Sequence, residues 1–148
     1  MSFPGAHAAA FAVVGLAAAG AVDTCRTGPG EPGGPRVEFT VVGALEGGKD
    51  PAARVDSVSS GEVVLRGGIS TPTPCYGISA EVVQRASALT LTLVATARPV
   101  VCIQVLAAFE YRARIYGLSA GHYAVEVVST YPGTGWMQPA DTLQVDVP

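Results

Sequence analysis

The three cysteines are the side chains of this sequence that are most able to do chemistry. Cys75 and Cys102 lie in the central part of the chain, and Cys25 lies far upstream. In an exported protein such a pair forms a disulfide, and this N-terminus has the features of an export signal. We therefore expect a Cys75–Cys102 disulfide, with two separate buried thiols or a pairing with Cys25 as the alternatives. A redox couple has less support, because redox cysteines lie close together in sequence.

Metal and cofactor sites are not expected. The cysteines are widely spaced, without a C-x-x-C pair, so they do not match a zinc site. A G-x-G-x-x-G pattern occurs at Gly28, Gly30 and Gly33, but Pro29 and Pro32 interrupt it. A dinucleotide loop also needs a strand before it, which is missing here. The sequence predicts no cofactor.

Catalytic groups are equally sparse. His122 is the only histidine after the leader, and we expect it to face solvent, opposite Tyr123 on the same strand. Asp141 and Asp146 lie on opposite sides of a predicted strand, so they do not form the carboxylate pair of a glycosidase. The sequence predicts a protein that is not an enzyme.

Two segments are candidate binding loops. In the first, the prolines fix the backbone of a segment whose candidate residues are Thr71, Pro72, Thr73, Pro74 and Tyr76. This segment is either a rigid crossover between two sheets or a protruding recognition loop.

The second candidate binding loop is rich in glycine and holds the only tryptophan. Its candidate residues are Tyr131, Trp136 and Met137. The aromatic side chain either closes one end of the domain or lies exposed as an anchor for a partner.

The elements that position these residues are strands, because apolar residues alternate with polar ones from Arg36 onward. Gly67 and Gly68 predict a bulge or bend. The predicted strands begin at Arg36, near Val55–Val58 and at Val63–Leu65, and continue with Tyr76–Gln84, Leu89–Ala97, Ile103–Tyr116, His122–Thr130 and Leu143–Val147.

Composition limits the class of protein. The chain has 148 residues, of which 49% are apolar and 14% charged, with 18 Gly, 11 Pro and a net charge of −3. This length fits one domain, and the frequent Gly and Pro suit an all-β fold with many turns. The net negative charge provides no basic field, so we expect no nucleic-acid partner.

The first residues resemble a secretory leader. Residues 8–22 carry no charge, yet they are too few to span a bilayer. Ala19-Gly20-Ala21 fits a cleavage site, so we expect a helical signal peptide over 1–21, although Met1 to His7 contains no Lys or Arg. A buried alanine-rich helix is the alternative.

Cys25 follows the leader where bacterial lipoproteins carry their acylated cysteine, which makes it a candidate lipidation site. Asp23 and Thr24 depart from the small apolar residues that usually precede that cysteine. The alternative is a mature chain that starts near Val22. Residues 22–35 are a Gly/Pro-rich, disordered linker by composition, and residues 36–148 form the folded domain.

Two motifs resemble known proteins. Leu118-Ser-Ala-Gly121-His-Tyr123 is similar to the tyrosine corner of immunoglobulin-like sandwiches, in which the tyrosine hydroxyl ties the corner to a nearby carbonyl. Residues 60–130 resemble uncharacterised bacterial secreted and lipoprotein sandwich domains, through Pro72-Thr-Pro74-Cys75-Tyr76, Cys102-Ile-Gln104-Val-Leu106 and Phe109-Glu110. That group has no assigned activity, so the resemblance implies fold and export only.

The fold expectation is an all-β, immunoglobulin-like antiparallel β-sandwich of about seven to eight strands. The expected function is that of a secreted, periplasmic or cell-envelope accessory domain that binds a protein or glycan or has a structural role. A small protease inhibitor that acts through Thr71–Tyr76 is the alternative. Contact with a membrane is expected only through a lipid on Cys25.

Overall fold

The computed structural model describes residues 33–46 and 50–148. The predicted signal peptide (1–21), the candidate lipidation site Cys25 and residues 22–32 of the predicted linker lie outside these ranges.

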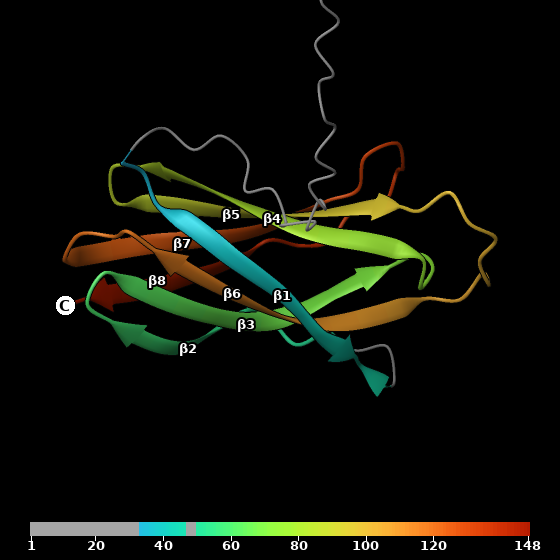
Figure 1. Ribbon diagram of the computed structural model, residues 1–148, viewed down its shortest axis with the longest axis horizontal. Helices are drawn as coiled ribbons and strands as arrows, with labels where there is room; N and C mark the ends of the chain where they lie inside the picture. The colour runs from blue at the N-terminus through green and yellow to red at the C-terminus, as the bar shows by residue number, and fades with distance from the viewer. Residues whose placement is uncertain (1–32, 47–49) are drawn as a thin grey trace, which may run out of the picture.

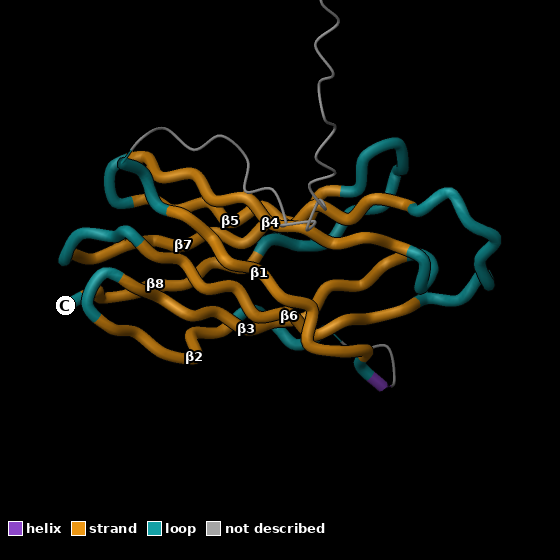
Figure 2. Tube along the Cα trace, in the orientation of Figure 1, coloured by secondary structure: helices purple, strands orange, loops and turns teal. Residues whose placement is uncertain are grey.

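Eight β-strands form the domain, as the alternation predicted (Figures 1 and 2). They are β1 (Arg36–Ala44), β2 (Arg54–Ser59), β3 (Glu62–Thr71), β4 (Tyr76–Arg85), β5 (Ala88–Ala97), β6 (Ala107–Tyr116), β7 (Gly121–Thr130) and β8 (Asp141–Val147).

The strands form two four-stranded sheets, which confirms the β-sandwich. The first sheet has the order β1-β6-β3-β2, and the second has the order β4-β5-β7-β8. All pairs are antiparallel except β5 and β7, which run parallel. The parallel pair arises because the chain leaves β5, forms β6 in the other sheet and returns to the second sheet. Parallel neighbours need such a crossover, since a tight hairpin cannot join them.

The core lies between the two sheets and is built from the inward positions of the alternating pattern. In β5, Leu89, Leu91 and Leu93 are buried, while Thr90, Thr92 and Val94, which alternate with them, are partly exposed. The other fully or nearly fully buried core side chains include Val63, Leu65, Ile69, Tyr111, Ala113, Ile115, Tyr123, Val125, Val127, Val145 and Val147.

The prediction of a bulge or bend at Gly67 and Gly68 was wrong. The pairing of β3 with β6 runs without interruption from Glu62 to Thr71. A Cβ on Gly67 would lie 2.5 Å from the hydroxyl of the buried Tyr111, and one on Gly68 would lie 2.5 Å from Pro51 Cδ. These glycines therefore admit close neighbours on both sides of a regular strand.

The prediction of a strand that begins at Ile103 was also wrong at its start. β6 begins at Ala107, and residues 103–106 lie in an exposed loop. The cause lies in the partner strand, because Ala107 pairs with Thr71 and the next residue is Pro72. Proline has no N–H to donate, so the ladder stops there despite the β-forming side chains beyond it.

The sandwich has two unlike ends. Strands β1, β3, β5 and β7 all finish at one of them, which we call the loop end. The connections there are 72–75, 98–106, 131–140 and the one that joins β1 to β2, of which the structure describes residues 45–46 and 50–53. The opposite end, the turn end, holds the short connections 60–61, 86–87 and 117–120. The first residues of β1 and the last residues of β8 also lie at the turn end (Figure 1).

Candidate functional site

The predicted disulfide lies at the loop end and joins two crossovers. The connection 72–75 carries the chain from the first sheet to the second, and the connection 98–106 carries it back. Cys75 and Cys102 are bonded with their Cα atoms 6.0 Å apart, within the usual span of a disulfide. The amide of Arg98 also donates to the carbonyl of Cys75, at 2.9 Å. The two crossovers are thus fixed to each other at two points.

Residues 98–106, which we call the apolar loop, hold the most exposed aliphatic side chains at this end. The exposed fraction of Val101 is 103%, and Ile103 and Leu106 follow at 67% and 66%. Val100 and Val105 are exposed by half or more. Figure 1 shows this loop as the yellow-to-orange segment that extends beyond the ends of the sheets. Such a gathering of exposed aliphatic side chains is typical of an interaction site.

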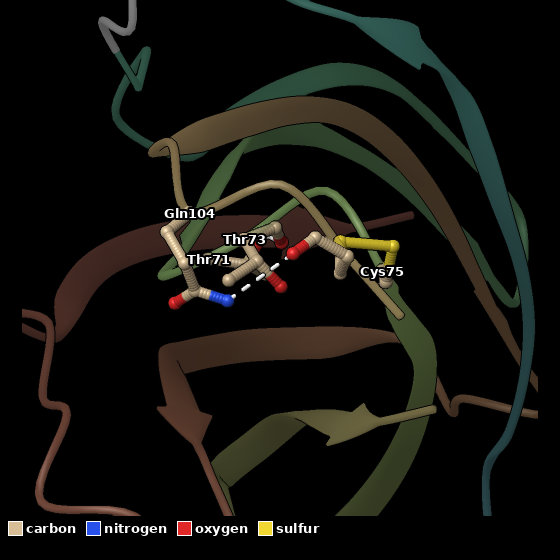
Figure 3. The surroundings of a disulfide bond; sticks show 5 residues. Thr71, Thr73, Cys75 and Gln104 are labelled. Carbon is tan, nitrogen blue, oxygen red and sulfur yellow. Dashed lines mark hydrogen bonds between the residues drawn. A yellow bond between two sulfur atoms is a disulfide. The ribbon is translucent and has the colours of Figure 1, made fainter. Parts of the chain in front are cut away.

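Apart from the disulfide at Cys102, the backbone contacts that hold the apolar loop lie near its start, among the described residues. Besides the bond from Arg98, the amide of Val100 donates to the carbonyl of Arg98 at 2.8 Å. The side chain of Gln104 donates to the carbonyl of Cys102 at 3.3 Å, close to the disulfide (Figure 3). Among the described residues, no amide from Val101 to Leu106 donates to another backbone carbonyl.

The segment Thr71–Tyr76 has the geometry of the crossover. Thr71 is fully buried, and its Oγ1 donates to the carbonyl of Thr73 at 2.7 Å (Figure 3). Pro72, Thr73, Pro74 and Tyr76 are half-buried. Packing and internal bonding therefore occupy much of this candidate loop.

The segment that holds Tyr131, Trp136 and Met137 divides into buried and exposed parts. Tyr131 is buried and donates to the carbonyl of Ser70 at 2.7 Å. Trp136 is half-buried against the core, with its ring edge-on to Tyr131 at a centroid distance of 6.4 Å. Met137 is 86% exposed. The aromatic pair closes the loop end, and Met137 adds one exposed apolar side chain to it.

A polar network fixes the connections beside the apolar loop. Gln138 lies within hydrogen-bond distance of the Tyr131 hydroxyl and of the carboxylate of Asp50. Burial raises the pKa of Tyr131 to about 12, so its hydroxyl stays protonated and able to donate. The amide of Ala53 donates to Asp141 at 2.8 Å, which joins the connection 45–53 to β8.

His122 faces solvent, as predicted, but it has a partner that the sequence did not reveal. Its Nδ1 lies 2.7 Å from Oδ1 of Asp146, directly opposite on β8. The hydrogen bond and charge of Asp146 raise the pKa of His122. Both side chains are largely exposed at the outer surface of the second sheet.

Charged side chains cover the outer face of the first sheet. Arg54, Arg66 and Arg112 lie in one row across three strands. Arg66 lies 3.5 Å from Asp56 and 3.7 Å from Glu110. In the next row, Arg114 lies 2.6 Å from Glu62, and this contact lowers the pKa of Glu62. Ion pairs at this exposure contribute little to stability.

Within residues 33–46 and 50–148, no three His, Cys, Asp or Glu side chains gather in a way that could hold a metal ion. Over the same ranges, no helix has the length and apolar character needed to cross a membrane. An open depression of about 280 Å³ lies near the turn end, lined by Gly33, Gly34, Arg36, Tyr116 and Gly117.

Comparison of the chain with models of protein families, with curated proteins and with solved structures finds no match.

Sequence reasoning missed the apolar loop because its second half, Ile103–Leu106, fits the strand predicted over Ile103–Tyr116. The run Val100-Val101-Cys102-Ile103 and the following Val105-Leu106 have high β-propensity. The available signal was the absence of alternation, since neighbouring residues are apolar at 100–101 and again at 105–106. A strand with one face in a core alternates with period two, and this run does not.

Proposed function

We propose that this chain is an exported, non-enzymatic β-sandwich module that binds a partner protein through the apolar loop at its loop end. The observation that carries the proposal is the exposure of five aliphatic side chains on one loop that a disulfide fixes to the body. Water is a poor solvent for such a surface, so covering it with a partner is favourable by roughly 25 cal/mol per Å².

Export is supported by the leader-like residues 1–21 and by the disulfide, because disulfides persist in oxidising compartments. A lipid on Cys25 would hold the module at a membrane, and cleavage near Val22 would release it. We propose that the chain belongs with the uncharacterised bacterial secreted sandwich domains that it resembles; its disulfide and tyrosine corner support this proposal.

A protein partner has more support than a glycan. Sugar-binding surfaces need polar side chains that can satisfy hydroxyl groups, and the exposed side chains of the apolar loop are aliphatic apart from Arg98 and Gln104. The fully buried centre of a protein interface is more apolar than its rim, which suits an apolar loop. A purely structural role in the envelope would give these side chains no specific partner.

The alternative drawn from the sequence, a protease inhibitor that acts through Thr71–Tyr76, has less support. An inhibitor loop must enter a protease cleft, and Thr71 is fully buried while its neighbours are half-buried. The apolar loop, which contains the other cysteine of the disulfide, is the more exposed of the two segments.

The test uses the purified domain as bait for extracellular and envelope proteins. A double variant, Val101→Asp with Ile103→Asp, changes the apolar loop. A second double variant, Val42→Asp with Val83→Asp, is the matched control, because both control valines are 52% exposed and lie on the edge strands β1 and β4, outside the apolar loop. We expect a partner that the wild type and the control retain and the loop variant loses. Equal retention by all three proteins would refute binding through this loop.

A mass spectrum of the mature protein tests export and anchoring. A diacylglycerol on Cys25 indicates a lipid anchor, an N-terminus near Val22 indicates release, and an intact Met1 in an exporting host refutes export. Binding of the wild type and the two double variants to an array of immobilised glycans tests whether the ligand is a glycan.

A further inference from the structure

The apolar loop has unpaired backbone as well as exposed side chains, and the two together restrict what can bind it. From Val101 to Leu106 the amides donate to no other backbone group among the described residues. A partner that covers this segment removes its backbone from water, and it must then supply hydrogen bonds, because each buried polar group left unsatisfied weakens the complex.

This requirement argues against a lipid surface as the occupant. Hydrocarbon offers no hydrogen-bond donors or acceptors, so exposed irregular backbone does not enter it. A protein that binds an extended peptide, in contrast, satisfies the backbone groups of its ligand and receives the side chains in pockets.

The exposure pattern distinguishes a cleft from a sheet edge. Val100 and Val101 are consecutive and both exposed, as are Val105 and Leu106. Side chains therefore project on both sides of the segment. Pairing with the edge of a flat sheet would bury only alternate side chains on each face, whereas a cleft encloses both sides.

The charge of the segment points to the same kind of partner. From Ala86 to Phe109 the only charged residue is Arg98. A cleft that complements this segment would therefore be apolar where it contacts the aliphatic side chains, and it would have room or an acidic partner for Arg98 at its edge.

The disulfide adds resistance to cleavage. Hydrolysis of a peptide bond between Cys102 and Ala107 would add one water and produce a carboxylate and an amine. The new carboxyl end would remain close to Cys102, which is bonded to Cys75, and the new amino end would remain attached to β6. Neither end can diffuse away, so the cut segment stays in place and the bond can re-form. Because the disulfide holds the segment at Cys102, the segment also loses less conformational entropy on binding than a free peptide would.

We infer that the apolar loop occupies the substrate cleft of an endopeptidase whose specificity pocket accepts aliphatic side chains, and that the module inhibits that enzyme. The inference rests on the proposed function, since it assigns a class of partner to the same loop. In this proposal the protease contacts the apolar loop, which contains Cys102, and not the segment Thr71–Tyr76, which contains Cys75 at the other end of the disulfide.

Three serine endopeptidases of one fold provide the test, because they differ in the specificity pocket. Elastase has a small apolar pocket, chymotrypsin a larger apolar one, and trypsin a pocket with an aspartate for basic side chains. We expect inhibition of elastase, chymotrypsin or both at about micromolar or lower inhibition constants, with no inhibition of trypsin. No inhibition of the two enzymes with apolar pockets, or equal inhibition of trypsin, overturns the inference.

Loop and control variants locate the contact. The Val101→Asp, Ile103→Asp double variant should raise the inhibition constant at least about tenfold, since both side chains enter the cleft. The Val42→Asp, Val83→Asp variant should leave it unchanged. An equal effect of the two variants overturns the inference. All these residues are exposed, so the variants are expected to fold, and circular dichroism checks this.

The mass of the module after long incubation tests its resistance. An inhibitor remains intact or carries one cut within residues 99–107 with both ends retained, whereas rapid fragmentation with loss of inhibition overturns the inference. If these tests fail while the loop-dependent partner of the preceding experiment is found, the proposed function stands and only the peptidase assignment falls. If no loop-dependent partner is found either, both fall.

Discussion

Individual side chains close the corners of this sandwich, and Tyr123 is the one whose role the sequence predicted best. It follows Leu118-Ser-Ala-Gly121-His, and its hydroxyl donates to the carbonyl of Ser119 at 3.0 Å. The motif is local, since donor and acceptor are four residues apart. A local motif can be interpreted without knowing which strands pair.

Tyr123→Phe should therefore lower the free energy of unfolding by about 1 kcal/mol, because it removes one part-buried hydrogen bond and keeps the ring. Denaturant unfolding measures the change. Tyr116→Phe is the control, since Tyr116 is exposed. Equal stability of the two variants would show that the corner hydrogen bond contributes nothing.

The His122–Asp146 contact leads to a pH-dependent prediction. Asp146 raises the pKa of His122, so the folded state binds the proton more tightly than the unfolded chain does. The resulting stabilisation is fully present below the unfolded pKa of about 6.5 and is lost as the pH rises through the higher folded pKa. Asp146→Asn should lower the pKa of His122, as measured by NMR titration of its ring protons. An unchanged pKa would contradict the contact.

The sequence predicted the orientation of His122 but not this contact. Orientation follows from alternation along one strand, whereas the contact depends on the register of β7 against β8. Register is set by long-range packing, which a single sequence does not display.

At the scale of the elements, alternation predicted all eight strands, and it failed where a neighbouring element decides the outcome. The start of β6 depends on Pro72 at the end of its partner, and the regular course of β3 through Gly67 depends on Tyr111 of β6. Both residues are far away in sequence. Glycine in a strand therefore allows a close neighbour here, where sequence reasoning alone predicted a bend.

Gly67→Ala should destabilise the domain by about 1–3 kcal/mol, because the new Cβ would overlap the buried Tyr111 ring and the core has no room to adjust. Gly43→Ala is the matched control in β1, since a Cβ there meets nothing within 4 Å. Thermal and denaturant unfolding of both variants provide the comparison. A loss of stability at Gly43 as large as that at Gly67 would refute the steric explanation.

At the scale of the whole molecule, the sequence predicted a sandwich and a disulfide but not the arrangement of the strands. Counting strands does not reveal that β5 and β7 run parallel or that the longer connections share one end. Those properties depend on which sheet each strand joins. The candidate site also depends on how the strands pair. The pairing of β3 with β6 ends at Ala107, and this leaves the preceding loop exposed.

Replacement of both cysteines, Cys75→Ser with Cys102→Ser, should lower the free energy of unfolding by about 3–4 kcal/mol on the chain-entropy account. The bond closes a loop with a sequence separation of 27 and joins the two sheets through their crossovers. Unfolding of the wild type with and without a reducing agent gives an independent measurement. If reduction and substitution both leave stability unchanged, the disulfide only positions the apolar loop.

The start of β1 and the end of β8 both lie at the turn end, and this decides which way the module would face if it were attached to a surface. The described chain enters β1 and leaves β8 at the end opposite the apolar loop (Figure 1). A support or a fused domain attached directly before β1 or directly after β8 would therefore lie behind the module. Copies fixed side by side would all present residues 98–106 outward, so crowding would raise the local density of binding loops without hiding them.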